Sequence, residues 1–260
     1  MSRLRGEGLS IAFGGVRALD GVSFAADAGE VLAIIGPNGA GKTTLFNIVS
    51  GLYRAQAGRV FLDGRDVTGL PPHALAALGL ARTFQNLQIF FRMSVLENVM
   101  VGRHLKEHRR LFAELLGLPS VLRENRESRR RALALLAFVG LADRAEDPAQ
   151  SLPYGALKRL EIARALASEP KVLMLDEPAA GCNPVETEEI DRLVLALARA
   201  GIAVVLVEHD MKLVMRISDR VLVLDRGRVL AEGRPQEVRA DPRVIEAYLG
   251  RHGLQTAHAA

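Results

Sequence analysis

The segment 36–44, GPNGAGKTT, is the feature that most restricts what this chain can fold into. It matches the P-loop pattern G-x-x-x-x-G-K-[ST], follows the aliphatic run VLAII and precedes the helical pattern LFNIVSGL. Glycines permit a tight turn whose backbone N–H groups point at phosphate oxygens, and the N-terminus of the following helix attracts the same anion. A Gly-rich turn matches by accident in about one chain in a hundred. The strand before the loop and the helix after it make an accident rarer still, so we expect a phosphate site here.

The run VLMLDEP, residues 172–178, predicts the second half of this site. Four apolar residues end in two carboxylates where a parallel strand emerges at the ligand edge of a sheet. Asp176 is expected to hold Mg²⁺ through water, and Glu177 to orient or deprotonate the attacking water. The alternative, a buried strand ending in a solvated Asp-Glu loop, is the better interpretation of this run alone. Beside a P-loop it becomes the weaker one, and the expected nucleotide contacts are Gly36, Asn38, Gly39, Gly41, Lys42, Thr43 and Thr44, with Lys42 on the terminal phosphates and Thr43 on Mg²⁺.

Short apolar runs alternate with helical patterns along the chain, which predicts an α/β fold. The runs 31–35, 172–175 and 203–207 are almost wholly aliphatic, as in strands buried on both faces of a parallel sheet. The runs 9–13, 22–24 and 60–62 favour a smaller antiparallel portion. Residues 87–151 are rich in Leu, Ala, Arg and Glu, which predicts a helical insertion. A strand pair is expected within residues 221–233, then a helix around 241–249, and a loose tail from residue 251.

Composition excludes several classes of protein. No apolar run approaches the roughly 20 residues of a membrane-spanning helix, and the segment MSRLRGEGLS lacks the apolar core of a signal peptide. The one cysteine, Cys182, excludes an internal disulfide and fits a reducing compartment. A net charge of +4 does not require nucleic acid, and we expect no such partner. These features predict a cytoplasmic chain.

The segment SLPYGALKRLEIARALASEP, directly before the Asp-Glu strand, resembles the signature of ABC-type ATPases. The order of motifs is also similar to that family: P-loop, ARTFQN, signature, Asp-Glu strand, AGCNP and VEHDM. The resemblance implies one cassette over residues 1–250, with a P-loop (RecA-like) core, a small antiparallel β portion and a helical subdomain inserted at about 87–154. It also implies a dimer in which ATP lies between the P-loop of one subunit and the signature of the other, so that closure depends on ATP itself.

Further roles follow from the resemblance residue by residue. Gln85 is similar to the glutamine that senses Mg²⁺ and water and links to the permease contact surface. His209 is similar to the switch histidine on the γ-phosphate, although a lone histidine at a strand end is more often an ordinary surface residue. Gly155 is similar to the signature glycine that faces the partner's nucleotide. Phe13 is similar to the aromatic residue that stacks on adenine, although a Phe at a strand end is usually part of the core.

Four positions depart from the family pattern. Pro153 replaces the signature serine, so a hydroxyl contact is lost, but proline is tolerated in the first turn of a helix. Ala156 replaces the signature glutamine. Asn183 stands at the usual D-loop aspartate, and Cys182 stands where an apolar residue is usual. These changes concern catalytic detail and rate rather than membership of the family.

Among ABC cassettes, the chain most resembles the ATPases of importers of branched-chain (hydrophobic) amino acids. The resemblance lies in FGGVRALDGVSF, ARTFQNLQIFFRMSVLENVMVGRH, the LPYG form of the signature and LDEPAAGCNP. It implies membrane permease subunits, a second ATPase subunit, an indirect link to a substrate-binding protein, and a peripheral position on the inner face of the cell membrane. Import of urea or short amides and export of lipopolysaccharide remain alternatives, because the permease and the binding protein select the substrate.

Other classes fit less well. Soluble ABC proteins of ribosomes or DNA usually carry two cassettes or a long coiled-coil insertion, and a GTPase would usually carry N-K-x-D; this sequence has none of these. The Arg-rich segment RENRESRRR leaves two interpretations open, since Arg123, Arg126 and Arg130 would share one helix face. A solvated face laced with Glu124 and Glu127 is favoured about two to one over contact with the permease or an anionic membrane surface.

Overall fold

A six-stranded sheet forms the centre of the molecule in the computed structural model, which describes residues 2–104 and 119–248. Its order is β10-β9-β3-β8-β7-β6. Neighbours run parallel from β9 to β6, and β10 pairs antiparallel with β9. The strands are β3 (Val31–Ile35), β6 (Leu80–Arg82), β7 (Val172–Asp176), β8 (Ala203–Val207), β9 (Arg220–Asp225) and β10 (Arg228–Gly233).

Every residue of β3, β7 and β8 is buried, as the aliphatic runs predict for strands covered on both faces. The α/β class is therefore confirmed. The edge strand β6 was not predicted. Its three residues are too few to show a pattern, and only the pairing with β7 identifies it.

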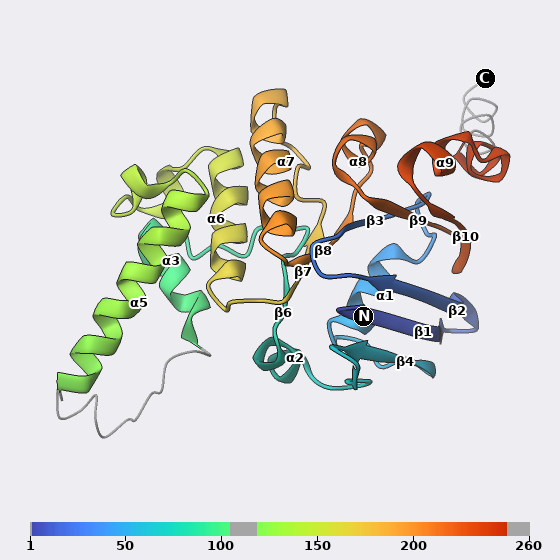
Figure 1. Ribbon diagram of the computed structural model, residues 1–260, viewed down its shortest axis with the longest axis horizontal. Helices are drawn as coiled ribbons and strands as arrows, with labels where there is room; N and C mark the ends of the chain where they lie inside the picture. The colour runs from blue at the N-terminus through green and yellow to red at the C-terminus, as the bar shows by residue number, and fades with distance from the viewer. Residues whose placement is uncertain (1, 105–118, 249–260) are drawn as a thin grey trace.

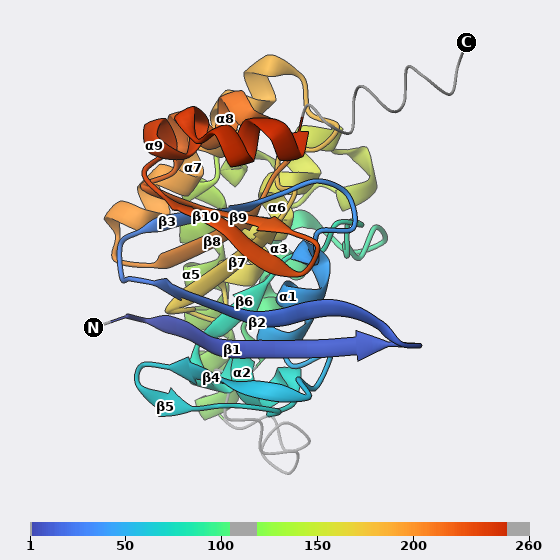
Figure 2. The ribbon, with the colours of Figure 1, turned by 90° about the vertical axis from the view of Figure 1, so that its right-hand side faces the viewer.

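A second, four-stranded antiparallel sheet of order β2-β1-β4-β5 crosses beside the first (Figure 2). It contains β1 (Leu4–Phe13), β2 (Val16–Ala26), β4 (Ala57–Leu62) and β5 (Arg65–Asp66), so the expected strands are present but longer. The helix α1 (Lys42–Val49) lies between the two sheets. Its Leu45 and Phe46 are fully buried, in one apolar cluster with Leu9 of β1 and Ile34 of β3. This packing holds the loop before α1 against both sheets.

The helix at residues 72–78 lies on the same face of the central sheet as α1, with its Leu75 in the same apolar cluster, whereas the other described helices pack on the opposite face and beyond the β6 edge. Figure 1 shows α3, α5 and α6 gathered at one end of the molecule, with α7 and α8 beside them. The helices are α2 (Pro72–Leu78), α3 (Val95–Gly102), α5 (Pro119–Phe138), α6 (Tyr154–Leu166), α7 (Pro184–Arg199), α8 (Met211–Ile217) and α9 (Pro235–Ala240), with short 3-10 turns at Ala142–Arg144 and Ala149–Ser151. Residues 242–248 are also helical, near the predicted position.

None of the helices within residues 2–104 and 119–248 is long and apolar enough to cross a membrane. The predicted tail, residues 251–260, lies outside the described residues.

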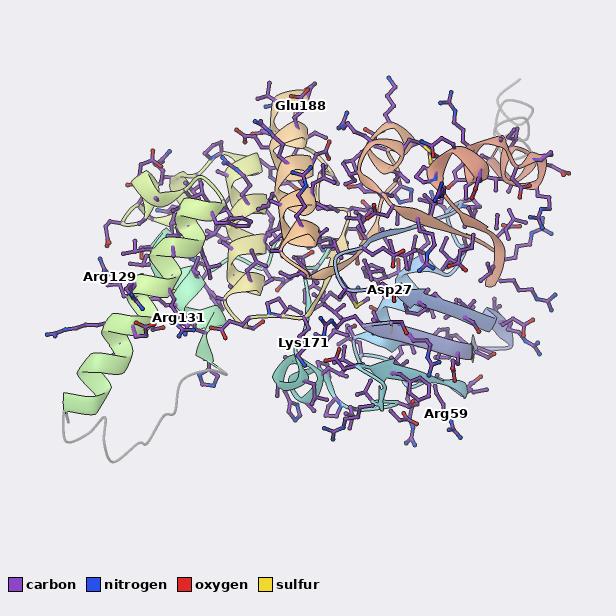
Figure 3. All side chains as sticks on the ribbon, in the orientation of Figure 1. Asp27, Arg59, Arg129, Arg131, Lys171 and Glu188 are labelled. Carbon is purple, nitrogen blue, oxygen red and sulfur yellow. The ribbon has the colours of Figure 1, made fainter. Side chains whose placement is uncertain are left out.

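Ion pairs engage three arginines of α5, Arg129, Arg130 and Arg131, of which the first and last are labelled in Figure 3. Glu127 binds Arg130 and Arg131, and the hydrogen bond from Arg130 is the main cause that lowers the pKa of Glu127 to about 2. Arg129 pairs with Glu146. These contacts are those of a solvated, charge-paired face. The side chains of Arg123 and Glu124 lie outside the described residues.

Candidate nucleotide site

The loop between β3 and α1 has a shape that requires glycine. Gly36 has φ 151°, and a Cβ there would overlap the carbonyl oxygen of Leu224. Gly41 has φ 105°, and its Cβ would lie 2.7 Å from the Ala18 carbonyl oxygen. Any L-residue side chain would therefore be strained and obstructed at both positions. The loop is held in one conformation, with the first turn of α1 directly behind it.

Lys42 is folded back over this loop. Its Nζ donates to the carbonyl oxygens of Gly36 at 2.6 Å and Pro37 at 3.1 Å, and the residue is 6% exposed. A lysine ammonium that is buried this far needs such acceptors or an anion. The geometry places a fixed cation at the loop where terminal phosphates are expected.

A cleft of about 680 Å³ opens over the P-loop. It brings together residues from six separate parts of the chain, and five of these parts lie at the carboxyl ends of parallel strands, where ligands are expected. Nine of the predicted site residues line it: Asn38, Gly39, Gly41, Lys42, Thr43, Thr44, Gln85, Glu177 and His209. Its wall also includes Val16, Arg17, Ala18, Ala40, Val207 and Arg226.

Glu177 is the centre of the polar wall facing the P-loop. His209 Nε2 lies 2.9 Å from its Oε1, and Gln85 Nε2 lies 3.4 Å from its Oε2. Glu177 has a positive φ of 49°, which is rare for a residue with a side chain, and its N–H donates to Val207 O at 3.0 Å. Such strain persists where surrounding contacts enforce it and gathers at functional sites. The three residues predicted to act on the γ-phosphate and the attacking water are thus mutually positioned.

Glu208, next to His209, was missed by sequence reasoning. Its carboxylate accepts hydrogen bonds from the backbone N–H groups of Ala179, at 3.1 Å, and His209, at 3.1 Å. Burial raises its pKa, because desolvation disfavours the charged form. It ties the loop after Glu177 to the loop that carries His209. The position of Glu208 directly before the candidate histidine, His209, could have identified it from the sequence.

Asp176 lies behind the cleft, at the end of β7, and is 6% exposed. Its Oδ2 accepts from Arg82 Nη2 at 2.9 Å, and its N–H donates to Thr83 Oγ1 at 3.3 Å. Arg82 was also not singled out from the sequence.

The residues of this site fit a hard divalent cation. Thr43, Gln85 and Asp176 offer hydroxyl, amide and carboxylate oxygens, the donor types that Mg²⁺ prefers. Within the described part of the chain, no group of three or more His, Cys, Asp or Glu side chains could hold a metal ion. Mg²⁺ commonly relies on one or two carboxylates together with substrate phosphates, so this donor set suits a metal that arrives with a nucleotide.

Gly155 is not brought into the cleft wall; it lies in the first turn of α6, after the N-cap residue Pro153. Its N–H donates to Glu186 Oε1 at 3.3 Å, and a Cβ on Gly155 would lie 2.6 Å from the same oxygen. Lys158, one turn further along α6, is 2% exposed and donates to the Glu177 carbonyl oxygen at 3.4 Å. Through Lys158, α6 thus contacts the loop that carries Glu177, while Gly155 at its N-terminus is not part of the cleft wall over the P-loop.

Phe13 lies at the exposed end of β1, 46% exposed, with its ring edge-to-face on Tyr53 at 5.4 Å between centroids. Its neighbours Val16 and Arg17 line the cleft. The adenine-stacking role of Phe13 stays a prediction.

Comparison with known proteins agrees with this geometry. Residues 19–180 match the model of the ABC transporter family, and residues 228–253 match that of the branched-chain amino acid ATP-binding cassette transporters. The chain is 44% identical to the high-affinity branched-chain amino acid transport ATP-binding protein BraF of Pseudomonas aeruginosa, over 96% of this chain and 99% of that protein.

Two solved structures are informative. A nucleotide-free ATP-binding cassette from an ABC transporter has a TM-score of 0.84 at 36% identity, over 95% of this chain and 99% of that one. A dimeric cassette in a post-hydrolysis state bound to ADP and Pi has a TM-score of 0.74 at 26% identity, over 89% and 98%. The P-loop, the carboxylates at the end of β7, the signature helix and these matches lead to one conclusion: the chain belongs to the ABC transporter family and is an ATP-binding, ATP-hydrolysing subunit coupled to transport.

Proposed function

We propose that this chain is the ATPase subunit of an importer for branched-chain or other hydrophobic amino acids. The observation that carries the proposal is the near full-length similarity to a branched-chain amino acid transport ATP-binding protein, together with the match of residues 228–253 to a model specific to that kind of cassette. These findings favour amino acid import over import of urea or short amides and over export of lipopolysaccharide.

The residues of the cleft take the following roles in the proposal. Lys42 binds the terminal phosphates, and Thr43, Gln85 and Asp176 hold Mg²⁺, which neutralises phosphate charge when bound. Glu177 accepts the proton of the attacking water at its carboxylate. His209, already 2.9 Å from Glu177, contacts the γ-phosphate from the same wall. Gln85 orients the water and the metal from the opposite side of Glu177.

The rest of the catalytic arrangement comes from a second subunit. Gly155 at the α6 N-terminus is not part of the cleft wall over the chain's own P-loop, so in this proposal it meets nucleotide across a dimer. The dimeric similar cassette bound to ADP and Pi supports this arrangement. We further propose one cassette domain over residues 1–250, with the helical subdomain inserted at about 87–154.

A groove of about 580 Å³ between the central sheet and the helical end is proposed to receive the permease. Its wall includes exposed or half-exposed apolar residues, such as Leu52 at 47%, Phe90 at 46% and Val101 at 40%. Exposed apolar side chains that gather in one place mark interaction sites. The groove wall reaches Phe84 and Leu87, which flank the Gln85 segment, so the permease contact and the cleft share one loop. The subunit would then be peripheral on the inner face of the membrane, linked to a substrate-binding protein through the permease.

Reconstitution tests this proposal. The chain would be co-purified with its permease, placed in proteoliposomes with the binding protein, and assayed for ATP hydrolysis with leucine, urea or lipopolysaccharide. Stimulation by leucine alone is expected, and none with Lys42→Ala. Stimulation by urea or lipopolysaccharide but not by leucine would transfer the chain to one of the alternative systems.

A further inference from the structure

Arg82, the last residue of β6, makes several polar and ring contacts near the nucleotide site. Its Nη2 lies 2.9 Å from Asp176 Oδ2, and both side chains are buried, at 6% and 7% exposure. Its Nη1 donates to Asn47 Oδ1 at 2.7 Å and to Ser50 Oγ at 2.8 Å, both on α1 or at its end. The rings of Phe46 and Phe84 lie 5.4 Å and 5.1 Å from the guanidinium carbon.

A buried ion pair of this kind is a costly feature. Removing two charges from water costs several kcal/mol per ion, which the pair recovers only with good geometry and further hydrogen bonds. Here the planar guanidinium supplies both, because its fork reaches Asp176 on one arm and two acceptors on the other. A lysine could not hold three acceptors in this plane. The arrangement therefore depends on arginine.

The elements joined by Arg82 are those that carry the nucleotide-binding residues. Asn47 belongs to α1, which begins at Lys42 and contains Thr43. Asp176 ends β7, and the segment that follows Arg82 carries Gln85 three residues later. The proposed magnesium ligands Thr43, Gln85 and Asp176 thus stand on three elements whose common contact is one guanidinium.

We propose that Arg82 is a positioning residue that sets the affinity of the site for Mg²⁺. With Oδ2 of Asp176 held by Arg82, the carboxylate is kept in one orientation, and Oδ1 would be the oxygen available to Mg²⁺ or to its water. Without Arg82, the carboxylate rotates, and a buried negative charge loses its partner. This inference rests on the proposed role of Asp176 in holding Mg²⁺, and the experiment separates the two.

The test compares Arg82→Gln and Arg82→Lys with the parent chain. Binding of a fluorescent ATP analogue is measured at increasing Mg²⁺, and again in excess EDTA. We expect Arg82→Gln to raise the half-saturating Mg²⁺ by ~10–100-fold, the usual effect of removing a group that orients a metal ligand. Arg82→Lys should raise it less. Affinity in EDTA should stay unchanged in both, because the P-loop contacts do not involve Arg82.

Arg103→Gln is the matched control. Arg103 is also buried, at 6%, and donates to Ser128 far from the cleft. It should lower the thermal midpoint while leaving the dependence on Mg²⁺ at the parental value. A folded Arg82→Gln that behaves like Arg103→Gln would show that Arg82 only braces the fold. An equal loss of binding in EDTA would overturn the inference as well.

Two further variants keep the test decisive. If Arg82→Gln does not fold, Ser50→Ala removes one anchor of the guanidinium and keeps the ion pair. It should raise the half-saturating Mg²⁺ several-fold, and a parental value would refute the inference. Asp176→Asn is measured in parallel. An unchanged Mg²⁺ dependence there would remove the proposed metal role of Asp176 itself, whereas a shift in Asp176→Asn without one in Arg82→Gln would remove only the role of Arg82.

Discussion

The N-termini of α1 and α6 are both suited to bind a phosphate, but the structure leaves them in different states. At α1, the glycine-rich loop, the folded-back Lys42 and the open cleft form a complete anion site. At α6, the carboxylate of Glu186 on α7 accepts from the Gly155 N–H and sits where an incoming anion would bind. A carboxylate at a helix N-terminus is stabilised by the same partial positive charge that would attract phosphate.

This difference shows how one chain can bind nucleotide alone and still need a partner for hydrolysis. The α1 end requires nothing outside its own loop. In the proposed dimer, the γ-phosphate of the other subunit replaces the Glu186 carboxylate at the α6 end, so this contact would depend on ATP and on dimer closure. Changes at α1 should therefore affect binding, and changes at α6 should affect only later steps.

Lys42→Ala should have the largest effect. It removes the fixed cation of the α1 end, so we expect hydrolysis to be lost and ATP affinity to fall by at least ~10-fold, as for loss of charge-assisted hydrogen bonds. Isothermal titration with ATP and a phosphate-release assay measure both. Hydrolysis equal to that of the parent would overturn the assignment of the P-loop.

Glu177→Gln should separate binding from turnover. Loss of a general base costs ~10²–10⁴ in rate, whereas the contacts of Lys42 with phosphate remain. Glutamine also removes a negative charge near the γ-phosphate, so a dimer with trapped ATP should accumulate. Size-exclusion runs with ATP, alongside rate measurements, check this. A monomer that hydrolyses ATP at close to the parental rate would show that Glu177 is not the base.

Gly155→Asp tests the α6 end directly. A Cβ there lies 2.6 Å from Glu186 Oε1, and the added carboxylate would repel both Glu186 and an incoming phosphate. The isolated subunit should keep ATP binding at the parental affinity but lose ATP-driven dimerisation and hydrolysis. Binding titrations, size exclusion and turnover are measured side by side.

Pro153→Ser is the matched control for this helix end. Serine is a favoured N-cap residue, so α6 should start at the same position and gain a hydroxyl donor. We expect parental or higher turnover. An active Gly155→Asp would refute the contact across the dimer, and a folded but inactive Pro153→Ser would mean that proline itself shapes the site.

Glu161→Gln, in the body of α6, should have the smallest effect. It tests whether a buried carboxylate far from the α6 N-terminus makes the stability of the protein depend on pH. Burial raises the pKa of Glu161 above its ordinary value of 4.5, with Lys158 and Arg164 nearby acting in the opposite direction. As pH rises above 4.5 the unfolded chain releases this proton first, so the free energy of unfolding falls until the pH passes the raised value. Glutamine removes this decline, so between pH 4 and pH 7 the free energy of unfolding of the variant should fall less than that of the parent.

Urea denaturation of variant and parent at a series of pH values measures this difference in the free energy of unfolding. Parallel stability profiles for variant and parent would show that Glu161 titrates as an ordinary carboxylate. ATP affinity serves as the control, because Glu161 makes no part of the cleft wall.

Much of the fold could be predicted from the sequence, because the patterns that indicate it lie within a few consecutive residues. The strands β3 and β8 have the predicted bounds. A strand that is buried on both faces needs apolar residues at every position, so its sequence is an unbroken aliphatic run. The edge strand β6 was missed because three residues carry no periodicity. For the Arg-rich segment, the sequence left open whether its charges form a solvated face or a contact surface. Only the structure shows that Arg130 and Arg131 pair with Glu127.

The sequence by itself determined the chemistry of the P-loop, the two carboxylates of β7 and the order of the motifs, because each is encoded within a few consecutive residues. Tertiary structure alone decided how these parts are held. Arg82 and Asp176 stand 94 positions apart, and Gly155 and Glu186 stand 31 apart. Contacts of this kind leave no local pattern, because the backbone must first bring β6, β7, α6 and α7 side by side. Once these elements are packed together, a buried charge such as that of Asp176 lies beside a partner that offsets the cost of removing it from water.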